Sequence, residues 1–194
     1  MGVTAVITAG GSSRRLGRDK GAESVGGQPL IARVASSLEP FEVRLLLCPD
    51  DRYASLGWPR AEDRLPGRGP LGGLATALAI AGTPWLAFSA ADLPYLTPSY
   101  WRLLAGARCE GASAVVAEDA GGRLQPLAAL YHQNAAAEVA HRLEAGQLAM
   151  HGLLKALPTV TLPWSALAGS FGEALFHNVN SEADLEAARR LLGP

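Results

Sequence analysis

The sequence predicts an α/β fold with a mostly parallel sheet. Three observations support this: short apolar runs alternate with segments of helical apolar spacing, the connections between them are short, and glycine-rich or acidic loops follow several of the runs. Strands that alternate with helices in this way are typical of parallel sheets. The 194 residues contain no repeat and no obvious linker, so we expect one domain spanning residues 1–194.

Strands are expected where β-branched or aliphatic residues form short uninterrupted runs. These runs are Val3 to Thr8, Val43 to Cys48, Trp85 to Ala90, Ala114 to Ala117 and Leu127 to Tyr131, with a further short strand near Glu62 and Asp63. Helices are expected at Leu30 to Leu38, Leu74 to Ala81, Pro98 to Ala107, Asn134 to Ala145 and Glu182 to Leu192. The pattern leaves the region around Met150 to Leu157 unassigned.

Composition narrows the class of protein. The chain is 48% hydrophobic and 18% charged with a net charge of −1, so no basic surface is expected to bind nucleic acid. No apolar run approaches the roughly 18 to 20 residues of a membrane span. The two cysteines are too few for a disulfide framework, and the N-terminus has no charged leader, so the expected location is the cytoplasm.

The first loop, AGGSSRRLGRDK, runs from Ala9 to Lys20. Its two adjacent glycines let the backbone turn tightly and bring free N–H groups close to an anion. Serines, arginines and Lys20 add donors and positive charge. Of the 17 basic residues 15 are arginine, so a lysine in this loop is unusual for the chain, and a lysine is a compact charge suited to a single phosphate oxygen. The loop therefore favours a triphosphate, although a purely structural turn remains open.

Other common site types lack their motifs. The dinucleotide fingerprint is absent because Gly10 and Gly11 are adjacent and the next glycine is Gly17, and no G-K-S/T closes a P-loop. The four histidines are too widely spaced for a zinc ligand pair, and no G-x-S-x-G or cysteine context indicates a covalent nucleophile.

Asp92 is the only charged residue between Gly69 and Trp101, and it directly follows a buried strand. A carboxylate at the rim of an apolar environment is costly without a cation. Mg²⁺ is the natural partner beside a phosphate ligand, since one or two carboxylates and phosphate oxygens usually hold it. The alternative is a turn cap, because Asp before Leu-Pro also favours turns.

Three further segments are candidates for the same rim. The loop GPLGG opens a helix and either lets a base or sugar lie against the backbone or only caps that helix. Asp63 precedes this loop and is either a ligand contact or a solvated charge. Asn178 and Asn180 precede a helix whose Ser181 and Asp184 form a capping-box pattern. Loops at the carboxyl ends of parallel strands share one face, so these residues are expected to meet.

Together these motifs resemble the molybdenum cofactor guanylyltransferases, a family of sugar-phosphate-type nucleotidyltransferases. AGGSSRRLGRDK, GPLGGL, ADLPY, LQPLAALY and NVNSEADL follow the family's order and approximate spacing over nearly the whole chain. The resemblance implies a Rossmann-like nucleotidyltransferase fold, a three-layer α/β/α sandwich. The double glycine with Arg-Asp-Lys, together with GPLGGL, indicates guanylyl rather than cytidylyl transfer.

The resemblance also implies roles for individual residues. The backbone of Thr8, Ala9, Gly10 and Gly11 would hold the guanosine and phosphates of GTP. Lys20 would bind the phosphates, and Arg15, with Arg14, would offset charge on the leaving pyrophosphate. Asp63 would contact the nucleotide, Asp92 would bind Mg²⁺, and Asn180 would lie near the metal and the acceptor.

The chain departs from the family pattern at three places. Thr8 replaces a usual Leu, and Cys48 stands where a nucleotide-contacting Asn occurs. The segment from Gly146 to Leu154, often arginine-rich and thought to face the pterin, here contains no basic residue except His151.

The reaction implied is Mg²⁺-dependent transfer of GMP from GTP to molybdenum-bound molybdopterin, with release of pyrophosphate. The substrates would be GTP and the molybdopterin cofactor, with transient contacts to proteins that supply or accept the cofactor, and with neither nucleic acid nor membrane as a partner. Two alternatives remain open. One is a nucleotidyltransferase that uses CTP or a sugar-phosphate acceptor, and the other is a non-catalytic GTP-binding protein that delivers cofactor.

Overall fold

The run Val3–Thr8 forms strand β1 near the centre of a seven-stranded sheet. The computed structural model describes residues 2–10 and 20–193. The sheet has the strand order β5-β4-β1-β6-β8-β7-β9, and β8 is antiparallel to both of its neighbours while the other pairs are parallel. The chain builds outward from β1 through β4 to β5, and then crosses to place β6 on the other side of β1. The strand order therefore reverses at β1, where α/β sheets bind ligands.

The strands agree closely with the sequence expectation. They are β1 (Val3–Thr8), β4 (Val43–Leu47), β5 (Arg60–Ala61), β6 (Trp85–Ala90), β7 (Ala114–Ala117), β8 (Ala128–His132) and β9 (Thr159–Leu162), with a separate hairpin of β2 (Ser24–Val25) and β3 (Gln28–Pro29). β6 and β7 match the expected bounds, and both are buried along their whole length. Burial on both faces explains why these strands read as continuous apolar runs rather than alternating ones.

The helices follow the same pattern. They are α1 (Leu30–Ser37), α2 (Gly69–Ile80), α3 (Pro98–Gly106), α4 (Ala136–Glu144), α5 (Met150–Ala156), α6 (Trp164–Leu167) and α7 (Glu182–Leu192), with short 3₁₀ turns at η1 (Lys20–Ala22), η2 (Ala54–Leu56), η3 (Gln133–Ala135) and η4 (Glu173–Phe176). The capping box expected at Ser181 and Asp184 is present. It fixes the start of α7 at the predicted residue.

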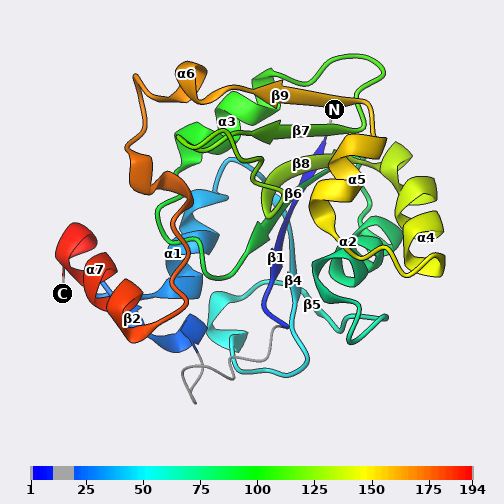
Figure 1. Cartoon of the computed structure of the whole chain (residues 1–194). Helices are drawn as coiled ribbons and strands as arrows, with labels where there is room; N and C mark the ends of the chain where they lie inside the picture. Colours follow the sequence, from blue (N-terminus) through cyan, green and yellow to red (C-terminus); the bar gives the residue numbers. More distant parts are fainter. Residues whose placement is uncertain (1, 11–19, 194) are drawn as a thin grey trace.

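Helices cover both faces of the sheet and make three layers. In Figure 1, α2, α4 and α5 lie on one face, and α1 and α3 lie on the other. Each face has its own buried cluster: Val34 of α1 and Trp101 of α3 belong to one, while Leu74 of α2 and Leu153 of α5 belong to the other. The expected α/β/α sandwich is confirmed.

Helix α7 packs away from the sheet, against the β2–β3 hairpin. Val25, Leu30 and Leu185 are fully buried in a small third cluster there. Arg189 bonds to the Ser24 carbonyl at 3.3 Å, and the Gly26 N–H donates to the Gly193 carbonyl at 2.8 Å. Helix α7 thus packs against the β2–β3 hairpin and holds it in place.

The structure differs from the expectation in several elements. Helix α2 begins at Gly69, so GPLGG forms its first turns instead of a loop before Leu74. The short third strand lies at Arg60–Ala61, just before Glu62. The unassigned region contains α5, and the edge strand β9 and the small β2–β3 hairpin were not predicted at all.

Within the described ranges, no helix is both long enough and apolar enough to cross a bilayer.

Candidate active site

A cavity of about 760 Å³ opens at the carboxyl ends of the parallel strands. The last residues of β1, β4 and β6, or the residues just beyond them, line it, and the start of α2 closes one side. The described lining residues are Thr8, Ala9, Gly10, Gly21, Leu47, Cys48, Pro49, Arg52, Tyr53, Glu62, Asp63, Pro66, Gly67, Gly69, Pro70, Ala90, Ala91, Asp92 and Leu127. The cavity lies where the strand order reverses, as the sequence predicted.

The described residues at the end of β1 and just beyond it line this cavity. Thr8, Ala9 and Gly10 line it, and backbone hydrogen bonds from the Ala9 N–H to the Leu47 carbonyl (2.9 Å) and from the Ala91 N–H to the Thr8 carbonyl (3.2 Å) hold the strand end between its neighbours. Gly11 and Arg15, like Arg14, lie outside the described residues. Lys20 begins η1, next to the lining residue Gly21.

Gly21 is a point of close approach between η1 and the loop after β4. A Cβ at this position would lie 2.3 Å from the hydroxyl oxygen of Tyr53, whose side chain is buried. Only glycine fits this approach without displacing the tyrosine ring. The contact brings the end of the first loop against the wall of the cavity formed by the loop after β4.

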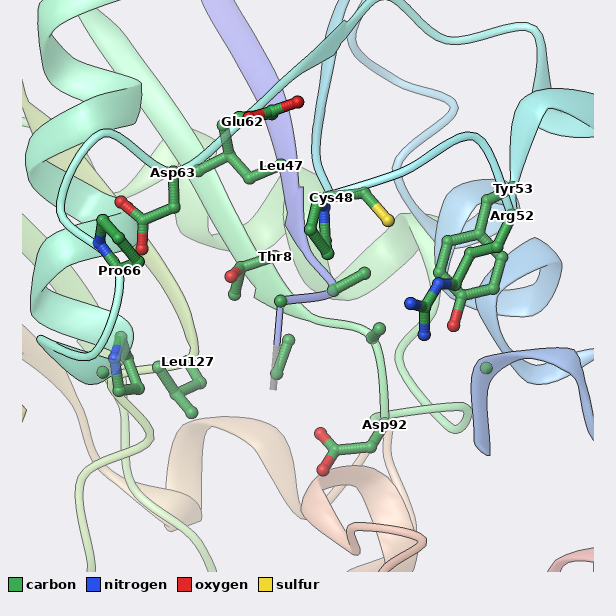
Figure 2. Close-up of a pocket in the computed structure, with 18 of the residues that line it drawn as sticks. Thr8, Leu47, Cys48, Arg52, Tyr53, Glu62, Asp63, Pro66, Asp92 and Leu127 are labelled. Carbon is green, nitrogen blue, oxygen red and sulfur yellow. The ribbon is translucent and has the colours of Figure 1, made fainter. Parts of the chain in front are cut away.

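Asp92 follows β6 and projects its carboxylate into the cavity from the opposite side to Thr8 and Asp63 (Figure 2). The Asp92 carbonyl accepts a hydrogen bond from the Val179 N–H at 3.0 Å, and the Asn178 side-chain amide donates to Asp92 Oδ1 at 3.4 Å. The segment before α7 therefore fixes both the backbone and the side chain of this carboxylate.

Asp63 lies across the cavity from Asp92, above Pro66 (Figure 2). Its Oδ1 accepts from the Leu65 N–H at 2.9 Å and from the Thr76 hydroxyl of α2 at 2.8 Å. Among the described residues, Asp63 Oδ2 has no hydrogen-bonding partner. One carboxylate oxygen thus ties the loop to α2.

The start of α2 comes unusually close to its surroundings. A Cβ on Gly72 would lie 2.8 Å from the Leu65 carbonyl oxygen, and one on Gly73 would lie 3.4 Å from Thr8 Oγ1. Gly72 therefore lets the loop before α2 pack tightly against the helix, whereas a Cβ on Gly73 would make only an ordinary contact with Thr8 of β1. Gly69 and Pro70 line the cavity. The motif GPLGG therefore has a packing role as well as a place at the site.

Asn180 does not line either of the two cavities described for residues 2–10 and 20–193. Its side chain is exposed, and its backbone N–H donates to Asp184 Oδ2 at 2.9 Å as part of the α7 cap. Of the two asparagines singled out from the sequence, Asn178 is the one that contacts Asp92.

The site also contains residues that the sequence did not single out. Arg52 and Tyr53 form the wall that faces Asp63 across the cavity (Figure 2). The Arg52 guanidinium makes a two-pronged pair with Asp50, and this hydrogen bonding lowers the pKa of Asp50 to about 2. The Pro49-Asp50-Asp51 turn after a buried strand was the only signal for this wall in the sequence.

The fold and the site together define a nucleotide-binding α/β domain of the nucleotidyltransferase type. A mostly parallel sheet reverses its strand order at a cavity that a glycine turn enters and that a fixed carboxylate faces. Both features suit a phosphorylated substrate.

The comparisons with known proteins agree and identify the family. The family model of the MobA-like NTP transferase domain matches residues 5–160, and the chain belongs to this family. It is 42% identical to a probable molybdenum cofactor guanylyltransferase of Deinococcus radiodurans, over 94% of this chain and 92% of the relative. It is 36% identical to a molybdenum cofactor guanylyltransferase of Cereibacter sphaeroides, over 99% and 98% of the two chains.

Solved structures share the fold. A molybdopterin-guanine dinucleotide biosynthesis protein A from Archaeoglobus fulgidus superposes with a TM-score of 0.81 at 25% identity, covering 97% of both chains. The 2-C-methyl-D-erythritol 4-phosphate cytidylyltransferase of Thermus thermophilus superposes with a TM-score of 0.73 at 20% identity, covering 99% of both chains. The expected nucleotidyltransferase fold is therefore confirmed.

Proposed function

We propose that this chain transfers GMP from GTP to the phosphate of molybdenum-bound molybdopterin, releasing pyrophosphate and forming the molybdopterin guanine dinucleotide cofactor. The names of its relatives support the two substrates. The observation in the molecule that carries the proposal is Asp92, whose carboxylate lies at the edge of a cavity large enough for a nucleotide. One hydrogen bond to its backbone and one to its side chain fix its position.

The cavity suggests how GTP lies. The phosphates belong at the turn after β1, where Gly10 exposes backbone to the cavity and Lys20 begins the next element. The guanosine then extends over Leu47 toward Asp63 and Pro66. Guanine presents N–H donors on its Watson–Crick edge, and the open Oδ2 of Asp63 is an acceptor suited to such donors.

The donor set fits a magnesium ion that comes with its nucleotide. Among the described residues no group of three or more His, Cys, Asp or Glu side chains is placed to hold a metal alone. Mg²⁺ is commonly bound by one or two carboxylates, substrate phosphates and water, so Asp92 with a triphosphate is a sufficient set. When bound, the ion would neutralise phosphate charge and orient the α-phosphate.

The chemical step balances without a covalent enzyme intermediate. An oxygen of the acceptor phosphate attacks the α-phosphorus of GTP, a new P–O bond forms, and the α–β bridging bond breaks to release pyrophosphate. The acceptor oxygen is already anionic near neutral pH, so no general base is required. The chain's own residues would bind and orient the substrates: Asp92 would hold the cation beside the α-phosphate, and Lys20 with Arg15 would offset charge on the pyrophosphate.

A nucleotide panel tests the choice of donor. The unfolding temperature is measured with Mg²⁺ and saturating GTP, CTP, UTP or ATP. GTP at about 100 times its dissociation constant should add about 2.7 kcal/mol, which is roughly 5 to 10 °C for a domain of this size. An equal or larger shift with CTP would favour the cytidylyl alternative.

Pyrophosphate release separates an enzyme from a cofactor-delivery protein. Wild-type protein with GTP, Mg²⁺ and molybdenum-bound molybdopterin should release pyrophosphate, and omission of the acceptor should abolish the release. A protein that binds GTP but releases none would support the non-catalytic alternative. The cytoplasmic location and the transient contacts with cofactor-handling proteins stay predictions.

A further inference from the structure

A second cavity of about 410 Å³ lies beside the first. Leu127 lines both cavities, and Leu93, which follows Asp92 in the chain, lines the second. Asn178 also lines it while its amide donates to Asp92 Oδ1. The Asp92 carboxylate therefore lies at the boundary between the two cavities.

The wall of the second cavity is built around Asp119, in the turn between β7 and β8. Asp119 is only 8% exposed, and its two oxygens accept from the Gly121 N–H, the Arg123 N–H, Arg123 Nε and Gln125 Nε2, at 2.9 to 3.0 Å. Burial alone would raise the pKa of this carboxyl, but the hydrogen bonds from Arg123 and Gly121 outweigh it and lower the pKa below its ordinary value of 3.8. The turn is thus held by a carboxylate that stays ionised.

Arg123 is tethered at one nitrogen and otherwise available. Its Nε is held by Asp119, its side chain is 81% exposed, and within the described part of the chain neither terminal guanidinium nitrogen has a partner. Two parallel N–H donors on a fixed plane are suited to an oxyanion. The side chain lines the cavity, and its two terminal nitrogens remain as donors for a ligand.

His151 reaches the same cavity from α5. Its Nε2 lies 3.1 Å from the Leu124 carbonyl oxygen, and because a carbonyl only accepts, this nitrogen is the donor. Gln125 Oε1 has no partner among the described residues. Glu173 and His177, at the start of η4 and just beyond its end, also line the cavity. The cavity thus combines a guanidinium, two imidazoles, an amide acceptor and one carboxylate, which suit a heterocycle that has hydrogen-bonding edges and carries an anionic group for Arg123 to bind.

A transferase of this kind needs an approach for its acceptor on the side of the α-phosphate away from the pyrophosphate. With the nucleotide in the first cavity, the second cavity, across Asp92, offers that approach. Of the described residues that line this second cavity, Arg123 is the only arginine or lysine, so it is the fixed positive charge that an anionic acceptor would meet there.

We propose that the second cavity is the acceptor subsite and that Arg123, positioned by Asp119, binds the anionic pterin acceptor, with His151 and Gln125 along its edge. This inference rests on the proposed function for the identity of the acceptor. Arg123 supplies the positive charge of this cavity from the turn between β7 and β8.

The test is steady-state transfer with the two substrates varied separately. Arg123→Ala keeps the backbone bond to Asp119 and loses a charge-assisted contact, so KM for molybdopterin should rise about 10- to 100-fold. KM for GTP should change less than about twofold, since Arg123 does not line the nucleotide cavity. The KM of Arg123→Lys for molybdopterin should lie between those of wild type and Arg123→Ala, because a single point charge replaces the two-pronged guanidinium.

Two further variants provide a control and a test of the role of Asp119. Arg102→Ala removes another exposed arginine, which lies on α3, pairs with Glu39 and lines neither cavity, and this variant should leave both KM values unchanged. Asp119→Asn keeps an oxygen for the backbone N–H groups but loses the charge that orients Arg123, so it should raise only KM for molybdopterin. The GTP-induced rise in unfolding temperature confirms that each variant is folded.

Equilibrium binding of molybdopterin, measured by ultrafiltration, distinguishes failure of this inference from failure of the proposed function. If wild type transfers GMP and Arg123→Ala leaves KM for molybdopterin unchanged, the subsite assignment is wrong. If wild type transfers nothing yet binds molybdopterin through Arg123, the subsite stands and the reaction does not. An equal rise of both KM values, or molybdopterin binding to Arg123→Ala as tight as to wild type, would also overturn the subsite assignment.

Discussion

At the scale of single residues, Asp92 is the centre of the account. Its isolation in an apolar stretch after a buried strand predicted a cation partner, and the structure adds the Asn178 amide that holds one of its oxygens at 3.4 Å. A carboxylate used for metal binding must be oriented as well as present. Asn178 supplies that orientation from a segment 86 positions away in the chain.

The first prediction is that Asp92→Asn abolishes turnover while the protein still folds. The amide keeps the shape of the side chain but removes the negative charge that would hold Mg²⁺, so kcat should fall by at least about 100-fold. The measurement is pyrophosphate release, with the unfolding temperature as the check on folding. Asp51→Asn is the matched control, because that exposed carboxylate pairs with Arg60 and, within residues 2–10 and 20–193, with no other cation. A kcat near the wild-type value would remove Asp92 from the metal site.

The sequence located the carboxylates of the site better than its arginines. Asp92 and Asp63 stood out because each borders a strand or a glycine-rich segment, and both line the cavity. Arg52 and Arg123 did not stand out, because 15 of the 17 basic residues are arginines and no local pattern marks two of them. Their importance depends on Asp50 and Asp119, partners that only a folded turn brings within reach.

At the scale of elements, helix α2 shows how one motif serves packing and binding together. The helix begins at Gly69, lines the cavity with Gly69 and Pro70, and packs against the loop before it at Gly72. The helical spacing of LATALAIA predicted the body of this helix. Its start was missed because glycines disfavour helix interiors, and tertiary packing overrides that preference here.

The second prediction concerns Gly72→Ala. The added methyl would lie 2.8 Å from the backbone carbonyl oxygen of Leu65, which has no side-chain freedom to yield. We expect a loss of about 1 to 3 kcal/mol of unfolding free energy, measured by urea denaturation, and a higher KM for GTP as the Pro66–Gly67 wall shifts. Gly106→Ala, at a helical glycine with open space around its Cβ position, should be neutral or stabilising. Equal stability of the two variants would contradict the packing role.

The elements that the sequence missed are short or half-exposed. Strand β9 is an edge strand whose residues are partly or fully exposed, so it shows neither a buried run nor clean alternation. The β2–β3 hairpin pairs only two residues on each strand. The antiparallel direction of β8 depends on which neighbours it finds in the sheet, and an apolar run carries no information about direction.

At the scale of the whole molecule, a single sheet joins every layer. The two large buried clusters lie on opposite faces but draw residues from the same strands, β1 and β6, so each cluster depends on the sheet that the other also needs. The family model covers residues 5–160, and the C-terminal segment beyond it returns to contact Asp92 and the β2–β3 hairpin.

The third prediction is that the chain unfolds as one domain. Because the two faces share their strands, calorimetry should give one transition whose calorimetric and van't Hoff enthalpies agree. Two resolved transitions would contradict this and would divide the molecule into the sheet with its helices and the small cluster of α7 and the β2–β3 hairpin.

The most direct test of the central claim follows the label of GTP through the reaction. Protein, Mg²⁺ and molybdenum-bound molybdopterin are incubated with GTP labelled at the α-phosphorus or, separately, at the γ-phosphorus. Attack at the α-phosphorus predicts that the α label appears in the molybdopterin dinucleotide and the γ label appears in pyrophosphate. Transfer of the γ label to the acceptor, or its release as orthophosphate, would contradict nucleotidyl transfer.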